Sequence, residues 1–142
     1  MLLVSVPAVG FTAKSIKEVS PSGVMTFYDA YTNTGNSYSL TTGAFICKTP
    51  GYYFFLTSLL KAENYNGSAS CHIMKNGNTT VYAYSKPGTT SNEGYAATVN
   101  GAYVHLDTED IVTLKKCSKT VSWSTSYGAS SFSGLLITPD AD

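Results

Sequence analysis

The sequence predicts an all-β protein, a sandwich or barrel of short strands, and three observations lead to this fold class. Apolar and polar residues alternate with a period of two along most of the chain, as residues of half-buried strands do. Clusters of Gly, Pro, Asn and Ser interrupt this alternation roughly every ten residues. Only Ser15–Ser20 looks helical, and Pro21 ends it, so no sustained helix is expected.

The strands follow in chain order from the alternation. Alternating residues predict strands around 9–13, 24–28, 81–83 and 104–106. The segment 51–56, GYYFFL, is apolar at successive positions, so this strand should be covered on both of its faces.

Turns are expected where Gly or Pro occurs beside small polar residues. The strongest signal is Asn76-Gly77, because both residues tolerate a positive φ. This turn should join a strand at 71–74 to one at 80–84. Further turns are predicted at 21–23, 33–36, 49–51, 86–88 and 100–101.

Composition indicates a single domain, residues 1–142, and excludes several classes of protein. Hydrophobic residues make up 43% of the chain and charged residues 13%, so burial can offset the entropy of ordering and the chain should fold. Nine Lys balance nine acidic residues, and the absence of Arg removes the phosphate-binding fork, which excludes a nucleic-acid partner. The longest apolar run, 52–56, is too short for a membrane span.

Glycosylation sequons favour a secreted, extracellular protein. They begin at Asn66 and Asn78, although sequons also arise by chance in a chain with 18 Ser and 18 Thr. The N-terminal segment 1–11 has no basic start, so we interpret it as the beginning of the domain and expect any leader upstream.

No motif indicates catalysis, and we expect a protein that is not an enzyme. The chain has no G-x-S-x-G, P-loop or G-x-G-x-x-G sequence. We interpret His105 as a satisfied strand histidine rather than a triad member. The acidic segment 107–110 is interpreted as a solvated hairpin turn, with an acid pair or a calcium ligand as the alternative. The spacing of Cys and His gives no support to a zinc site.

An aromatic and glycine pattern in the first half of the chain is too specific to come from composition. It consists of Phe27, Asn33, Tyr38, Phe45, Gly51, Tyr53 and Phe55. This pattern resembles the C1q domain, the globular head of the C1q and tumour-necrosis-factor-like superfamily. The resemblance extends over almost the whole chain, through VGFTAK at 9–14, MKNGNTTV at 74–81, VHLDTEDIVTL at 104–114 and SSFSGLLITPD at 130–140. Two positions depart from it: Thr57 replaces an aromatic residue, and Glu109-Asp110 replaces Gly-Asp.

The resemblance implies a ten-stranded jelly roll that assembles as a homotrimer, without a collagen stalk in this chain. A neighbouring subunit would cover the second face of strand 51–56, and Phe132 and Leu135 are expected to share that interface. The family's topology also places the strands of all three cysteines in one sheet, with that of Cys117 in the middle. A bridge from Cys117 to Cys71 or Cys47 is then conceivable, but we favour three buried thiols.

Two long loops are candidates for ligand binding, because loops carry function on a rigid sandwich. Loop 61–69 and loop 118–127 place aromatic rings among hydroxyls and amides, which suits a sugar or a polar epitope. The candidate ligand-binding residues are Trp123, Tyr127, Tyr65, Asn64 and Lys119. The alternative for Trp123 is that it packs over the edge of the sandwich. A third loop, 89–95, is polar but less specific.

Two functions follow from the resemblance. Family members without a stalk often bind microbial glycans, which favours a lectin-like pattern-recognition protein of innate immunity. The alternative is a secreted signalling or adhesive ligand that docks a protein receptor. The low charge and the Ser- and Thr-rich loops favour the first. No cofactor is expected to be obligatory, and calcium, with Glu63 and Asn66 as candidate ligands, is the one exception considered.

Overall fold

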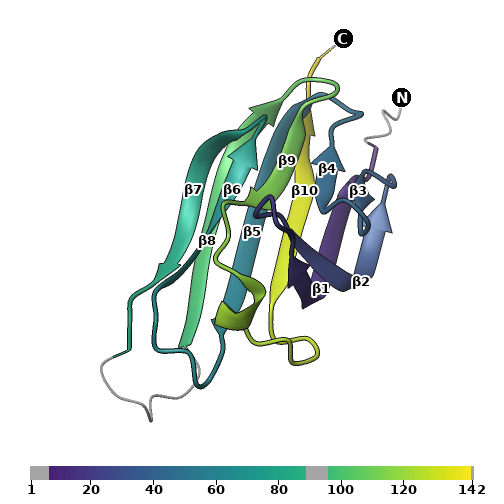
Figure 1. Ribbon diagram of the computed structural model, residues 1–142. Helices are drawn as coiled ribbons and strands as arrows, with labels where there is room; N and C mark the ends of the chain where they lie inside the picture. Colours follow the sequence, from purple (N-terminus) through teal and green to yellow (C-terminus); the bar gives the residue numbers. More distant parts are fainter. Residues whose placement is uncertain (1–6, 89–95, 142) are drawn as a thin grey trace.

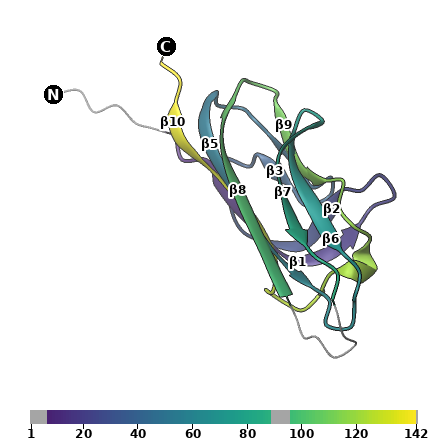
Figure 2. The ribbon, with the colours of Figure 1, turned by 90° about the vertical axis from the view of Figure 1, so that its left-hand side faces the viewer.

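Two five-stranded antiparallel sheets pack face to face in the computed structural model, which describes residues 7–88 and 96–141 (Figure 1 and Figure 2). The first sheet has the order β2 (Met25–Thr34), β1 (Gly10–Val19), β10 (Ser131–Pro139), β5 (Gly51–Lys61) and β8 (Ala96–Leu106). The second has the order β3 (Tyr38–Ser39), β4 (Ala44–Ile46), β9 (Ile111–Lys115), β6 (Ala69–Lys75) and β7 (Asn78–Ser85). A short 3-10 turn, η1 (Thr120–Ser122), precedes β10. The predicted ten-stranded jelly-roll sandwich is confirmed.

In the part of the chain that the structure describes, no helix has the length and apolar character needed to cross a membrane.

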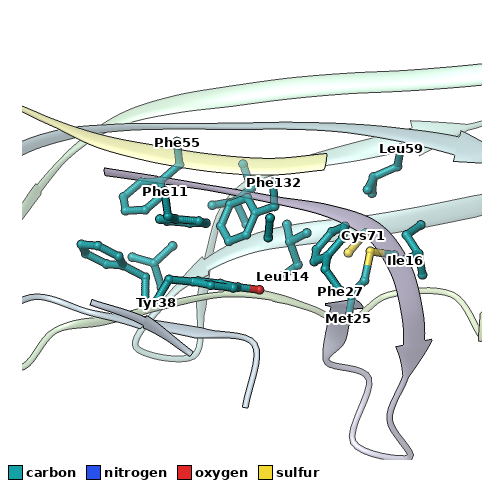
Figure 3. Packing of buried hydrophobic residues seen from close by; sticks show 14 of the residues in the cluster. Phe11, Ile16, Met25, Phe27, Tyr38, Phe55, Leu59, Cys71, Leu114 and Phe132 are labelled. Atoms are coloured by element: carbon teal, nitrogen blue, oxygen red, sulfur yellow. The ribbon is translucent and has the colours of Figure 1, made fainter. Parts of the chain in front are cut away.

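Aromatic side chains from both sheets form the centre of the core (Figure 3). The Phe11 ring stacks on the Tyr38 ring with centroids 4.2 Å apart and meets the Phe132 ring edge-on at 5.2 Å. Phe45 packs edge-on against Phe55 at 5.4 Å. The aromatic residues of the family pattern are therefore the side chains that hold the two sheets together.

The two non-aromatic residues of the pattern, Asn33 and Gly51, shape the backbone at a turn and at a close approach of two strands. The Asn33 side chain donates a hydrogen bond to the Tyr38 carbonyl and accepts one from the Tyr38 N–H, so it closes the turn between β2 and β3. At Gly51 a Cβ atom would collide with the Thr138 carbonyl oxygen and would lie 2.8 Å from Pro139 Cα. Glycine there lets β10 approach β5.

The one helix-like stretch in the sequence, 15–20, is not helical, because 15–19 continue β1. Ser15 has a φ of 66°, and the register of β1 against β2 shifts between Ile16 and Glu18. Ser15 and Ile16 are both buried, so a strand irregularity interrupts the period of two. That interruption made the segment look helical.

One predicted hairpin is confirmed and one predicted turn is wrong. Asn76 and Gly77, with φ of 50° and 82°, join β6 to β7. Asn100-Gly101, in contrast, lies inside β8, where a Cβ at position 101 would lie 2.9 Å from Phe54 Cζ. Glycine at 101 makes room for a neighbouring ring rather than for a turn.

The preference for three free thiols is wrong. Cys71 in β6 and Cys117, which follows β9, form a disulfide. The two strands are neighbours in the second sheet, as the family topology implies. Cys47 is the buried free thiol, and burial raises its pKa.

The outer face of the first sheet is unusually apolar. Tyr52 and Leu56 of β5, Tyr103 of β8 and Leu135 of β10 are all exposed on it, and the Tyr52 and Tyr103 rings stack 5.2 Å apart. The predicted strand 51–56 thus has apolar residues on both faces, and the subunit expected to cover the outer one stays a prediction. The expectation that Phe132 also lies on this face is wrong, because its side chain is fully buried between the sheets.

Candidate functional site

The two loops singled out from the sequence meet at one end of the sandwich, the end that carries η1 in Figure 1. Between them lies an open pocket of about 470 Å³. Its lining comes from two segments, Ala62–Tyr65 and Trp123–Ser126, together with Val121.

Backbone hydrogen bonds fix the two loops against each other. The Ala62 N–H donates to the Ser122 carbonyl at 2.9 Å, and the Ser124 N–H donates to the Leu60 carbonyl at 2.8 Å. Lys61 and Trp123 form an isolated antiparallel bridge. The pocket therefore rests on the end of β5 rather than on two independent loops.

Tyr65 has a defined position at the pocket. Its N–H donates to the Ala62 carbonyl at 3.1 Å, and its ring lies 5.9 Å from the Lys61 ammonium. A Cβ at Gly67 would lie 2.7 Å from the Tyr65 hydroxyl oxygen, so glycine at 67 leaves space for the ring. This half-buried ring is the aromatic surface that the pocket offers to a ligand.

The second lining segment contributes hydroxyl residues. The Ser124 hydroxyl donates to the Ser126 hydroxyl at 3.1 Å and accepts a hydrogen bond from the Ser126 N–H. Thr125, between them, is exposed. Glu63 is the one charged residue in the lining, so the surface is polar and nearly neutral.

The Trp123 ring is not exposed, although its candidate role in ligand binding would require exposure. Its side chain is 2% exposed, and the indole N–H donates to the Ser118 carbonyl at 3.0 Å. It supports the pocket from within the core. The alternative interpretation, packing over the edge of the sandwich, describes its position.

The remaining predicted residues are divided between the pocket and its surroundings. Asn64 lines it together with Tyr65. Lys119 instead borders a separate hollow next to Cys117. Tyr127 is exposed farther along the loop, where its hydroxyl accepts a hydrogen bond from Lys14 Nζ at 2.8 Å. Loop 89–95 lies outside the described residues.

The described residues of this region do not bring the two candidate calcium ligands, Glu63 and Asn66, together in the pocket lining. Calcium takes six to eight oxygen ligands in proteins. Glu63 supplies the one carboxylate of the lining, while Asn66 is not part of it and uses its backbone carbonyl to accept a hydrogen bond from the Gly88 N–H. No step of binding is therefore assigned to calcium.

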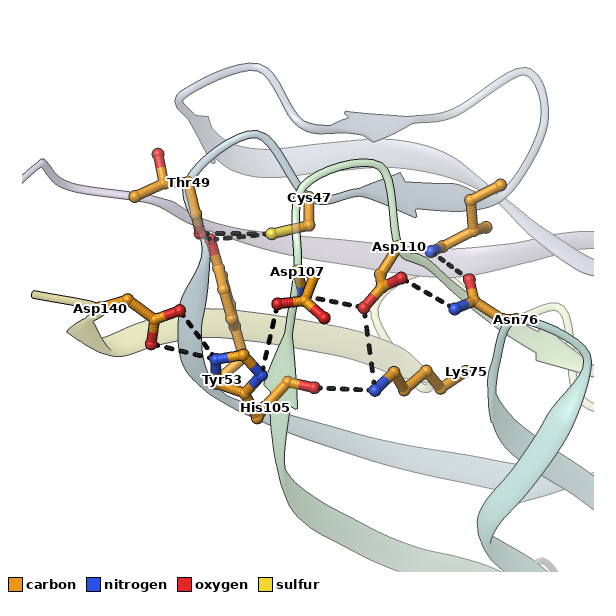
Figure 4. A network of polar contacts seen from close by, with 10 residues as sticks. Cys47, Thr49, Tyr53, Lys75, Asn76, His105, Asp107, Asp110 and Asp140 are labelled. Atoms are coloured by element: carbon orange, nitrogen blue, oxygen red, sulfur yellow. Dashed lines mark hydrogen bonds and ion pairs between the residues drawn. The ribbon is translucent and has the colours of Figure 1, made fainter. Parts of the chain in front are cut away.

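The acidic turn at 107–110 is a structured hairpin (Figure 4). The Asp110 carboxylate accepts hydrogen bonds from the Asn76 amide at 2.9 Å and from the Asp107 N–H at 2.8 Å. The same two hydrogen bonds lower the pKa of the Asp110 carboxyl. Asp110 thus fixes the turn through its neighbours, and this supports the interpretation as a hairpin.

Sequence reasoning missed two features of this surface. Val121 contributes an exposed apolar side chain to the pocket, and its isolated position in a polar loop gave no signal. A second groove, about 630 Å³, runs between β7 and β8 with Tyr82 and Tyr84 exposed beside it. The alternation of Tyr with Val and Ala in 81–84 was the signal for that exposure.

Solved structures share this fold. The globular domain of zebrafish complement 1qA protein superposes with a TM-score of 0.69 at 18% identity and covers 95% of this chain and 100% of that chain. The structure of Eiger TNF from S. frugiperda gives a TM-score of 0.72 at 11% identity and covers 96% of this chain and 97% of that chain.

Curated proteins are similar in sequence. A complement C1q subcomponent from Bos taurus is 31% identical over 137 residues, which cover 95% of this chain and 54% of that protein. Complement C1q tumor necrosis factor-related protein 3 from Homo sapiens is 34% identical over 90 residues, which cover 60% of this chain and 36% of that protein. The chain thus spans about half the length of the first relative and about a third of the second. The model of the C1q domain matches residues 10–137. The chain therefore belongs to the C1q domain family.

Proposed function

We propose that this chain is a secreted recognition protein that binds glycans of microbial surfaces through the pocket at the η1 end. The observation that carries the proposal is that Tyr65 lines the same pocket as the hydroxyl residues Ser124, Thr125 and Ser126. A sugar offers an apolar ring face for stacking and hydroxyls for hydrogen bonding, and this pocket offers the complement of both.

The charge of the pocket supports the same ligand class. Glu63 is the one charged residue in the lining of the pocket. The pocket is open, so it suits the end of a glycan chain better than a small molecule that must be enclosed. The action proposed is binding without a catalytic step. Two of the relatives carry the word complement in their names, which supports a recognition role.

The proposal includes assembly as a homotrimer. The exposed apolar residues Tyr52, Leu56, Tyr103 and Leu135 form a contiguous surface across β8, β5 and β10. Large apolar patches on soluble proteins mark interfaces with other molecules. Three copies arranged around a three-fold axis form a closed assembly in which no copy of the interface is left exposed. Three copies would present three pockets, so weak binding to each sugar would be reinforced by avidity.

The test is a glycan and bacterial-surface binding array with the wild-type protein, Tyr65→Ala and Tyr28→Ala, run with and without calcium. Tyr28 is an exposed tyrosine of β2 and serves as the matched control. We expect saturable binding that Tyr65→Ala weakens by about tenfold, because stacking on an aromatic ring is worth on the order of 1 kcal/mol. Equal binding by both variants would contradict the assigned pocket. A folded trimer that binds no glycan would contradict the glycan proposal and favour a protein receptor.

A further inference from the structure

A second cluster of chemistry-bearing side chains lies at the end of the sandwich opposite to the pocket. His105 is near the end of β8, Asp107 follows in the turn to β9, and Asp140 follows β10 (Figure 4). The strands β8 and β10 both pair with β5, one on each side, which brings residues 35 positions apart together.

The imidazole ring of His105 faces a carboxylate on each side. Its Nε2 lies 3.0 Å and 2.9 Å from the two carboxylate oxygens of Asp140. Its Nδ1 lies 3.9 Å from Asp107 Oδ1, which is longer than a hydrogen bond. One nitrogen of the ring and one oxygen of each carboxylate lie within 4.8 Å of one another.

The ring is held in this orientation by its neighbours. The Tyr52 ring packs edge-on against it with centroids 4.9 Å apart, and Tyr103 in turn stacks on Tyr52. A ligand set is more effective when packing fixes the orientation of the side chains.

No lysine neutralises the two carboxylates within the described residues. The nearby Lys75 ammonium pairs with Asp110 at 3.7 Å and donates to the His105 carbonyl. Among residues 7–88 and 96–141, the ion pairs of Asp107 and Asp140 are made with His105 alone. Two carboxylates and one imidazole thus share a single positive charge at most.

We propose that His105, Asp107 and Asp140 bind a divalent transition-metal ion of the zinc class. One imidazole nitrogen and two carboxylate oxygens are ligands that Zn²⁺ and Co²⁺ accept, whereas Ca²⁺ prefers oxygen ligands alone. Metal–ligand bonds of about 2.0–2.2 Å place neighbouring ligand atoms roughly 3–3.5 Å apart. The Asp107 side chain is 77% exposed, and the proposal requires it to turn toward the ion.

Binding of the ion would join the end of β8 to the segment after β10. The spacing of these residues in the sequence matches no zinc motif, because the site is assembled by sheet pairing and not by one local segment. Water would complete the coordination sphere, which leaves the ion open to a further ligand.

The experiment is a calorimetric titration of the untagged full chain with Zn²⁺, together with the visible absorption of bound Co²⁺. We expect one ion per chain, a rise in melting temperature and a cobalt spectrum. His105→Ala and Asp140→Asn should weaken the affinity at least about tenfold. His72→Ala is the matched control, because the chain has two histidines and His72 instead stacks on Tyr82 in the second sheet.

Three results would overturn the proposal. They are the absence of Zn²⁺ binding by the wild-type chain, an unchanged affinity in His105→Ala, and an equal loss in His72→Ala. Circular dichroism of each variant without metal shows whether that variant is folded. If His105→Ala does not fold, Asp140→Asn still tests the proposal.

Discussion

The ring and the hydroxyl of Tyr38 have opposite effects on stability. Its ring stacks on Phe11 in the core, yet its hydroxyl is buried and finds no hydrogen-bond partner among the described residues. Burial also raises the pKa of this hydroxyl.

Tyr38→Phe should therefore leave the free energy of unfolding unchanged or raise it by about 1 kcal/mol, because an unpaired buried polar group is removed. Tyr53→Phe is the matched control. The Tyr53 hydroxyl donates to the Thr49 carbonyl at 2.6 Å, and its loss should cost about 1–2 kcal/mol. Urea unfolding of both variants measures the difference, and a larger loss for Tyr38→Phe than for Tyr53→Phe would contradict this account.

Single residues were also the hardest part of the site to predict. The sequence placed Tyr65 and Asn64 in a candidate loop, and the structure brings both to the pocket. It could not decide the exposure of Trp123, because that depends on how this segment pairs with Lys61, 62 positions away, and the side chain is in fact buried. A local pattern of Trp among hydroxyls fits an exposed ring and a buried one equally well.

The turn before β9 forms without the glycine that the family pattern has there. Glu109 adopts a φ of 75°, and its N–H donates to the Cys47 carbonyl at 2.8 Å. A side chain in this left-handed region carries a steric cost that glycine avoids. The turn persists because the Asp110 and Asn76 hydrogen bonds hold it.

Glu109→Gly should raise the free energy of unfolding by about 0.5–1 kcal/mol, since relief of the positive φ exceeds the added chain entropy. Thr108→Gly, one residue earlier and without a positive φ, should lower it by a similar amount. Thermal unfolding of the two variants compares them. Destabilisation of the same size by both would show that the backbone conformation at 109 costs nothing.

The disulfide ties two elements of the second sheet together. Cys71 and Cys117 lie 46 positions apart in the sequence, and closing such a loop in the unfolded chain stabilises a protein by about 3–4 kcal/mol. A reductant should lower the free energy of unfolding of the wild-type chain by this amount. The double variant Cys71→Ser/Cys117→Ser should not respond to reductant, and an equal response by both would contradict the pairing.

Elements were predictable where the local signal matched the tertiary environment. The strands with strict alternation and the hairpin at Asn76-Gly77 lie where the sequence placed them. Ser15–Ser20 and Asn100-Gly101 were misjudged because a bulge and a close approach to Phe54 are properties of neighbouring strands. The pairing of Cys71 with Cys117 likewise depended on strand order rather than on cysteine spacing.

At the scale of the whole molecule, the proposed trimer depends on the apolar outer face of the first sheet. Leu56→Asp places a charge in the middle of that face and should convert a trimer to a folded monomer at micromolar concentration, because an unpaired charge in an interface costs several kcal/mol. Ile46→Asp, on an exposed residue of the second sheet, is the matched control and should remain trimeric. Light scattering measures both masses, and a monomeric wild-type chain would contradict the proposed face.

The most direct test of the central claim is hydrogen exchange of the backbone amides with and without a glycan that binds saturably. Glycan binding in the pocket should slow exchange in both segments that meet there, 62–65 and 122–126, because a ligand between them restrains both. Protection confined to the outer face of the first sheet, or to the groove between β7 and β8, with no change in these two segments, would contradict it.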